Sequence, residues 1–192
     1  MFNNISEQLT NKLLENKTIC AENKGIYQFG IAQTLIMMLN ILTAIGIGIV
    51  TQMLGHAIWF IIAFIPLRIF AGGAHAKTPF RCYIYSMIFL AAVLLIMRFV
   101  HIRYLIYCIL YIISSITILL LAPVEDSNKL LDKLEKSIYK KRTIMLWIIE
   151  SIITFVCFFL KLRIVTECFT MSIFSIAIIV VLGALKNKIN TV

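Results

Sequence analysis

Charged and chain-breaking residues are both scarce in this sequence. Only 14% of its 192 residues are charged, whereas roughly a quarter are charged in a soluble domain. The 61% hydrophobic content and the mean hydropathy of +0.96 are too high for a water-soluble core of this size, so a bilayer is the expected solvent. The alternating segments of a membrane barrel are also missing. With only 3 Pro and 8 Gly, the chain is expected to be all-α and polytopic, because helices satisfy their own backbone in lipid.

Several site motifs are missing as well. The 5 cysteines form no CxxC pair and there is no HExxH, so we expect no disulfide framework, no metal and no cofactor. No GxSxG serine motif occurs. Asp126 and Asp132 share one charged segment, which excludes an intramembrane aspartyl pair. The first 24 residues lack the apolar region of a signal peptide, so the first span is expected to direct insertion.

Six apolar runs predict six membrane spans across the ~30 Å hydrocarbon core. They cover residues 31–50, 53–67, 83–100, 104–122, 143–160 and 164–185. Most of the 18 Lys and Arg residues fall in the N-terminal segment, the second and fourth connections and the C-terminus. Basic segments stay in the cytoplasm, which predicts that both termini face it. The net charge of +9 then indicates attraction to anionic membrane lipids, about 1 kcal/mol for each base, rather than nucleic-acid binding.

Two segments have the apolar spacing of amphipathic helices. One carries Phe2, Ile5, Leu9 and Leu13. The other carries Leu130, Leu131, Leu134 and Ile138, with lysines opposite. Both are expected to lie on the inner leaflet, either as membrane anchors or as docking sites for an amphipathic partner.

Polar residues are concentrated in the stretch RIFAGGAHAKTPFRC, residues 68–82. His75 and Cys82 would lie ~10 Å apart along a continuous helix, too far for a hydrogen bond. Gly72-Gly73 and Pro79 both favour a break in the helix. We therefore predict a turn that brings Cys82 back against His75.

A cysteine beside a histidine suits nucleophilic chemistry. A free thiol has a pKa near ~8.5, and a neighbouring imidazole can accept its proton. Lys77 and Arg81 would add positive potential, and N–H groups around Gly72-Gly73 would receive an oxyanion. Arg68 is too costly to leave in lipid, so it is expected either to hold a substrate carbonyl or carboxylate, or to brace the turn.

Two acidic residues fall within or beside apolar runs. Glu150 lies inside the fifth run, and Glu167 lies near Arg163 at the start of the sixth. Each of them has two possible roles: a structural bond to a polar partner, or a place along a path for substrate or product. His56 and His101 are expected near the opposite side of the membrane from His75.

The stretch at 68–82 resembles the signature of the accessory gene regulator B (AgrB) family of membrane endopeptidases in Gram-positive bacteria. The matching positions are Arg68, Gly73, His75 and Cys82, and residues 122–129 (APVEDSNK) are similar to the family's loop after the fourth span. The resemblance extends over nearly the whole chain. It implies one membrane domain, residues 1–192, with an amphipathic segment at 1–28 and a basic cytoplasmic loop at 123–142.

The resemblance also implies an activity. Family members cut an AgrD-like propeptide and help to make a cyclic quorum-sensing peptide, a thiolactone or lactone. Carried over, Cys82 is the nucleophile and His75 its base, while Arg68 and Gly73 support the site on the cytoplasmic side of the cell membrane. A homodimer is typical of the family.

Two other functions remain open from the residues. A small peptide transporter or export factor would use Glu150 and Arg68 along a path, with Cys82 incidental. A membrane scaffold for a partner would have no catalytic activity at all.

Overall fold

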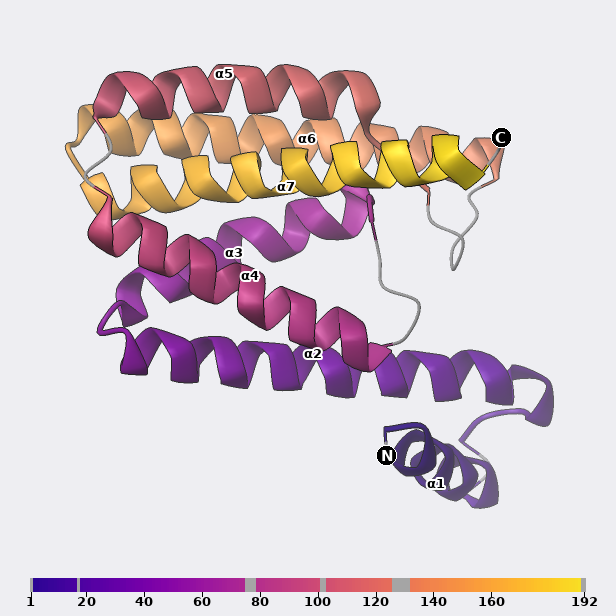
Figure 1. Cartoon of the computed structure of the whole chain (residues 1–192). Coiled ribbons are helices and arrows are strands. Elements are labelled where there is room, and N and C mark those ends of the chain that lie inside the picture. The colour runs from indigo at the N-terminus through magenta and orange to yellow at the C-terminus, as the bar shows by residue number, and fades with distance from the viewer. Residues whose placement is uncertain (1, 17, 75–78, 101–102, 126–131, 191–192) are drawn as a thin grey trace.

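A computed structural model of the chain describes residues 2–16, 18–74, 79–100, 103–125 and 132–190 (Figure 1). The described residues form α-helices and one short 3-10 helix, and they contain no strand. The elements in order are α1 (Phe2–Glu15), η1 (Ala21–Asn23), α2 (Lys24–Val50), α3 (Leu54–Ala71), α4 (Pro79–Phe99), α5 (Tyr104–Leu121), α6 (Lys133–Phe159) and α7 (Arg163–Asn190).

Helices α2 to α7 are long and apolar enough to cross a membrane, which confirms the prediction of an all-α protein with six spans. Even the shortest of them, α3 and α5, have 18 residues. At 1.5 Å per residue they reach roughly 27 Å, close to the thickness of the hydrocarbon core.

Several helix limits differ from the sequence prediction: α4 begins at Pro79 rather than at residue 83, and α7 runs on to Asn190 rather than ending at residue 185. The second span does not end before Arg68, because α3 runs on to Ala71. Helix α2 begins at Lys24 rather than at residue 31. Helix α6 begins at Lys133, so the second half of the predicted loop 123–142 is helical. There the Glu135 carboxylate accepts the N–H of Asp132 at 3.1 Å, which stabilises the helix start.

The two amphipathic segments have different outcomes. Helix α1 forms as predicted and packs on α2. Its buried residues are Ser6 and Thr10, which leaves the apolar stripe partly exposed, with Leu9 at 42%. The second segment is not a separate helix: Leu134 and Ile138 belong to the first turns of α6, and residues 130 and 131 lie outside the described residues.

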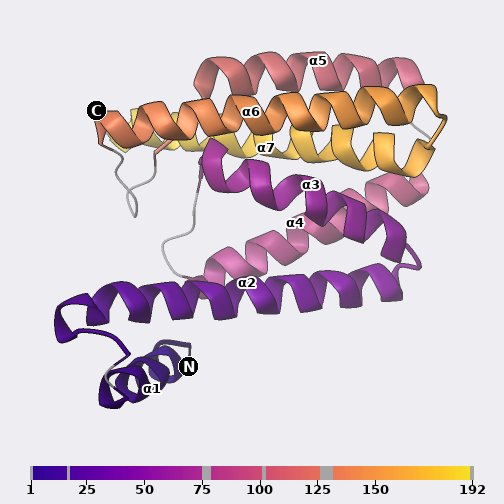
Figure 2. The same ribbon diagram turned by 180° about the vertical axis from the view of Figure 1, so that it is seen from behind.

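The spans form an open arrangement around α7. Helices α5, α6 and α7 lie side by side, α3 packs along α7, and α4 crosses obliquely towards α2 (Figures 1 and 2). Helix α1 lies beside the start of α2, away from the other spans (Figure 1). Helix α7 is the most buried span because α3, α5 and α6 all contact it.

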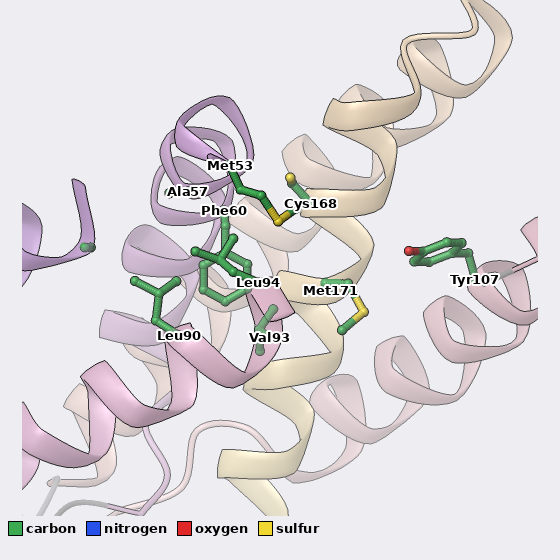
Figure 3. Packing of buried hydrophobic residues seen from close by; sticks show 10 residues of the cluster. Met53, Ala57, Phe60, Leu90, Val93, Leu94, Tyr107, Cys168 and Met171 are labelled. Atoms are coloured by element: carbon green, nitrogen blue, oxygen red, sulfur yellow. The ribbon is translucent and has the colours of Figure 1, made fainter. Parts of the chain in front are cut away.

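Two apolar clusters hold the bundle together. One joins the start of α3 to α4, α5 and α7 through residues that include Phe60, Leu94, Tyr107 and Met171 (Figure 3). The other joins the end of α3 to α5 and α7, with Leu67, Ile118, Ile173, Ile176 and Val180 all fully buried. This second cluster includes Leu67 and Ala71 at the end of α3, so it directly adjoins the turn that follows this helix.

Basic residues gather at the end of the bundle where α3, α5 and α7 finish and α4 and α6 begin. We call this the basic end. It carries Arg68, Arg81, Lys133, Lys136, Lys140, Lys141, Arg142, Lys186 and Lys188. The opposite end carries Arg98, Arg103, Lys161 and Arg163.

Candidate functional site

A glycine turn ends α3 at the basic end. Gly72 and Gly73 have φ angles of 70° and 107°, which side chains other than glycine rarely adopt. The turn ends the helix at Ala71, and it leads into the connection that contains His75. The sequence prediction of a helix break at this glycine pair is therefore confirmed.

Hydrogen bonds tie this turn to two distant parts of the chain. The Gly73 N–H donates to the Val124 carbonyl at 2.9 Å, and the Val124 N–H donates to the Ala71 carbonyl at 3.0 Å. Together they form an isolated parallel bridge between Gly72 and Val124. The Ala74 N–H donates to the Ile179 carbonyl of α7 at 3.1 Å. The turn is thus anchored to the segment after α5 and to α7.

The N–H groups of this glycine pair, which the sequence suggested as oxyanion donors, form hydrogen bonds within the protein. The Gly72 N–H donates to the Arg68 carbonyl at 3.3 Å, and the Gly73 N–H is used by Val124. Both donors are taken by the protein's own backbone, so neither points to a substrate carbonyl.

Arg68 braces the turn, which was one of its two predicted roles. Its Nη2 donates to the Ala74 carbonyl at 2.8 Å, and its Nη1 donates to the Gly72 carbonyl. The planar guanidinium bonds two backbone carbonyls at once through separate nitrogens, which a lysine ammonium with its single nitrogen does not reproduce. This bonding also explains why α3 continues through a charged residue, because the Arg68 side chain bonds to backbone carbonyls just beyond the helix end.

The segment after α5 is anchored in turn. The Asn187 Nδ2 donates to the Glu125 carbonyl at 2.7 Å, and the Lys136 ammonium pairs with the Glu125 carboxylate at 2.8 Å. Sequence reasoning singled out residues 122–129 by resemblance but missed Gly183, Ile179 and Asn187. Gly183, near the end of the last apolar run, was the one local signal in the sequence that could have indicated a close contact with α7.

Cys82 is the fourth residue of α4 and is partly exposed. It therefore lies in the first turn of a helix that starts at the basic end, beside α2 (Figures 1 and 2). Arg81 next to it is exposed. His75 and Lys77 lie outside the described residues, so the predicted contact between His75 and Cys82 stays a prediction.

The remaining polar candidates lie away from this turn. Glu167 pairs with Arg163 at 2.6 Å, as their spacing suggested. Glu150 is buried in α6, and among the described residues its Oε2 has no hydrogen-bond partner. His56 lies at the other end of α3, where its carbonyl accepts the Cys168 thiol at 3.4 Å. His101 lies outside the described residues. No group of three His, Cys, Asp or Glu residues in the described ranges is placed to hold a metal.

Six apolar helices, with a braced glycine turn and a helix-initial cysteine at the basic end, define a multi-pass membrane protein with a candidate thiol site. The model of the family Accessory gene regulator B matches residues 6–183, and the chain belongs to this family. The chain is therefore a membrane protein of the agr quorum-sensing system. The family is known for peptidase-like processing of AgrD-like propeptides. Neither the comparison with curated proteins nor that with solved structures finds a match.

Proposed function

We propose that this protein is a membrane cysteine endopeptidase that cuts an AgrD-like propeptide, with Cys82 as nucleophile and His75 as its base. The observation that carries the proposal is the position of Cys82 in the first turn of α4. Only residues 75–78 separate that helix from the anchored turn, so the proposed base lies in the short connection directly before the helix that carries the nucleophile.

The start of α4 favours the negative charges that this chemistry creates. The first turn of a helix presents backbone N–H groups that the helix itself does not use, and it carries a partial positive charge. A thiolate at Cys82 and an oxyanion on the scissile carbonyl would both form there. The helix start thus takes the role that the sequence assigned to Gly72-Gly73.

The reaction has two steps. His75 takes the proton of the Cys82 thiol, the sulfur attacks the scissile carbonyl carbon, and the C–N bond breaks. The imidazolium returns the proton to the departing amine of the C-terminal tail, and the peptide remains as a thioester on Cys82. A Cys thiol or Ser hydroxyl within the peptide then attacks the thioester, releases Cys82 and closes a thiolactone or lactone ring.

Two features support a site at the cytoplasmic face. The basic end carries most of the charge, as expected for the inner side of a membrane. Helix α1 leaves its apolar stripe partly exposed beside α2. An amphipathic propeptide bound to the inner leaflet would diffuse only along the membrane surface, which raises its effective concentration at this stripe.

Replacement of Cys82 tests the proposal. The chain is expressed with a panel of tagged AgrD-like propeptides, and the propeptide that it shortens is used with Cys82→Ala and Cys82→Ser. We expect both variants to accumulate in the membrane and to leave the propeptide intact. Cys108→Ala is the matched control, since Cys108 is an exposed thiol near the start of the apolar helix α5, away from the basic end. Cleavage by Cys82→Ala at the parent rate would remove the peptidase assignment.

Export is the second candidate, and Glu150 favours it. A buried carboxyl with one oxygen unpartnered among the described residues is costly inside a membrane, unless it serves a path or a bound group. In Glu150→Gln the peptidase proposal expects shortened peptide at the parent rate. An export function expects shortened peptide to accumulate inside the cell.

A further inference from the structure

Helix α7 meets the turn after α3 with no side chain between the two backbones. The Ala74 N–H donates to the Ile179 carbonyl at 3.1 Å, one helical turn before Gly183. A Cβ on Gly183 would lie 2.6 Å from the Ala74 nitrogen and 2.7 Å from the Gly73 Cα. A Cβ on Gly73 would in turn lie 2.7 Å from the Ile179 oxygen. The contact therefore needs glycine on both sides.

We propose that Gly183 is a positioning residue for propeptide cleavage, because it lets α7 hold the backbone that leads directly into His75. The inference rests on the proposed function, in which His75 is the base. Gly183 touches neither substrate nor Cys82 in this role. It acts through Gly73 and Ala74, whose place against α7 sets where the His75 connection begins.

Alanine at position 183 would displace this backbone. Ordinary van der Waals contact begins at 3.4 Å, so the added methyl group must push the Ala74 nitrogen by roughly 0.8 Å. The obstructing atoms are backbone, and no side-chain rotation relieves the contact. A misplacement of about 1 Å at a reacting group can lower a rate by about 100-fold. We therefore expect Gly183→Ala to slow cleavage by roughly 10- to 100-fold with an unchanged KM.

Gly46→Ala is the matched control. Gly46 also lies inside a membrane-spanning helix, α2, but a Cβ there meets nothing within 4 Å. Alanine forms helices better than glycine, so neither variant weakens its helix intrinsically. Gly46→Ala is expected to cleave the propeptide at the parent rate.

Alkylation of Cys82 gives a second readout that needs no propeptide. Membrane vesicles are treated with iodoacetamide at neutral pH, and modification of Cys82 is followed by mass spectrometry. With its base misplaced, Cys82 should react more slowly in Gly183→Ala, by roughly tenfold or more. Cys82 lies on α4, which packs mainly on α2, so a general weakening of α7 would not slow this reaction.

The outcomes separate the inference from the proposed function. Slow cleavage and slow alkylation in Gly183→Ala, with Gly46→Ala unaffected, support the positioning role. Parent behaviour of Gly183→Ala, while Cys82→Ala is inactive, overturns the positioning role alone. Cleavage by Cys82→Ala overturns the proposed function itself.

Asn187→Ala tests the same anchoring if Gly183→Ala does not accumulate in the membrane. This variant adds no atom and removes the 2.7 Å hydrogen bond to the Glu125 carbonyl, which ties the Val124 segment to α7. We expect both cleavage and Cys82 alkylation to slow by about threefold to tenfold, the effect of one hydrogen bond. Parent rates for both reactions would overturn the proposal.

Discussion

Replacing Arg68 by lysine should separate the shape of the guanidinium from its charge. In the structure the two Nη atoms of Arg68 donate to the carbonyls of Gly72 and Ala74, the latter at 2.8 Å. A lysine ammonium keeps the positive charge, but it is a point donor on a flexible stem. Arg68→Lys should therefore keep one of these bonds at most, and the turn that leads into His75 loses its brace.

The expected loss follows from the strength of one such bond. A hydrogen bond to a charged group contributes about 1.5–3 kcal/mol. Arg68 is half-buried, so solvent screening favours the lower end of this range. At about 1.4 kcal/mol per factor of ten, the equilibrium constant for forming the braced turn falls roughly tenfold. Propeptide cleavage should fall by up to the same factor, because the unbraced turn no longer presents His75 correctly.

The assay is the rate at which a tagged AgrD-like propeptide is shortened in membrane vesicles containing equal amounts of each variant. Arg98→Lys is the control: Arg98 also donates to a backbone carbonyl, that of Thr51, but it lies at the opposite end of the bundle. We expect parent activity from Arg98→Lys. Equal rates for Arg68→Lys and the parent would refute the bracing role, and equal losses in the two variants would show a general effect of the substitution.

Three further predictions concern stability and topology. Leu67→Ala removes a fully buried side chain from the cluster below the turn, and it should cost about 2–5 kcal/mol of stability, measured as a lower Tm in detergent. Glu167→Gln breaks the ion pair with Arg163 at the other end of the bundle and should lower the Tm slightly without slowing cleavage; slower cleavage would contradict the separation of the two ends. Cys20, exposed just before α2, should react with a membrane-impermeant maleimide in inside-out vesicles but not in intact cells, and the reverse would place the N-terminus outside.

The spans were predictable because the bilayer imposes a simple rule on sequence. A run of apolar residues long enough to cross the hydrocarbon must be helical, whatever its neighbours are. All six runs were found in this way, and the resemblance to the AgrB family at residues 68–82 is confirmed by the family match over residues 6–183. The glycine break after α3 also followed from local chemistry, since Gly72-Gly73 tolerates positive φ.

The helix limits were less predictable because hydropathy does not mark them. Arg68 is charged, yet it lies inside α3, since its side chain reaches carbonyls beyond the helix end. Residues 133–142 are mostly polar or charged, yet they extend α6, because lysine and glutamate are good helix formers where water can reach them. Apolar runs therefore located the part of each helix within the lipid but not the part outside it.

The sequence alone determined that this is a six-span helical membrane protein with a thiol, an imidazole and a glycine turn near its basic end, because lipid solvation and local backbone chemistry act on neighbouring residues. Only the tertiary structure decided how the turn's hydrogen bonds are used. The Gly73 N–H is taken by Val124, the Ala74 N–H by Ile179, and Gly183 leaves the space for that approach. These partners are distant in the chain, and they meet because α3, α5 and α7 pack side by side. No local pattern encodes that packing.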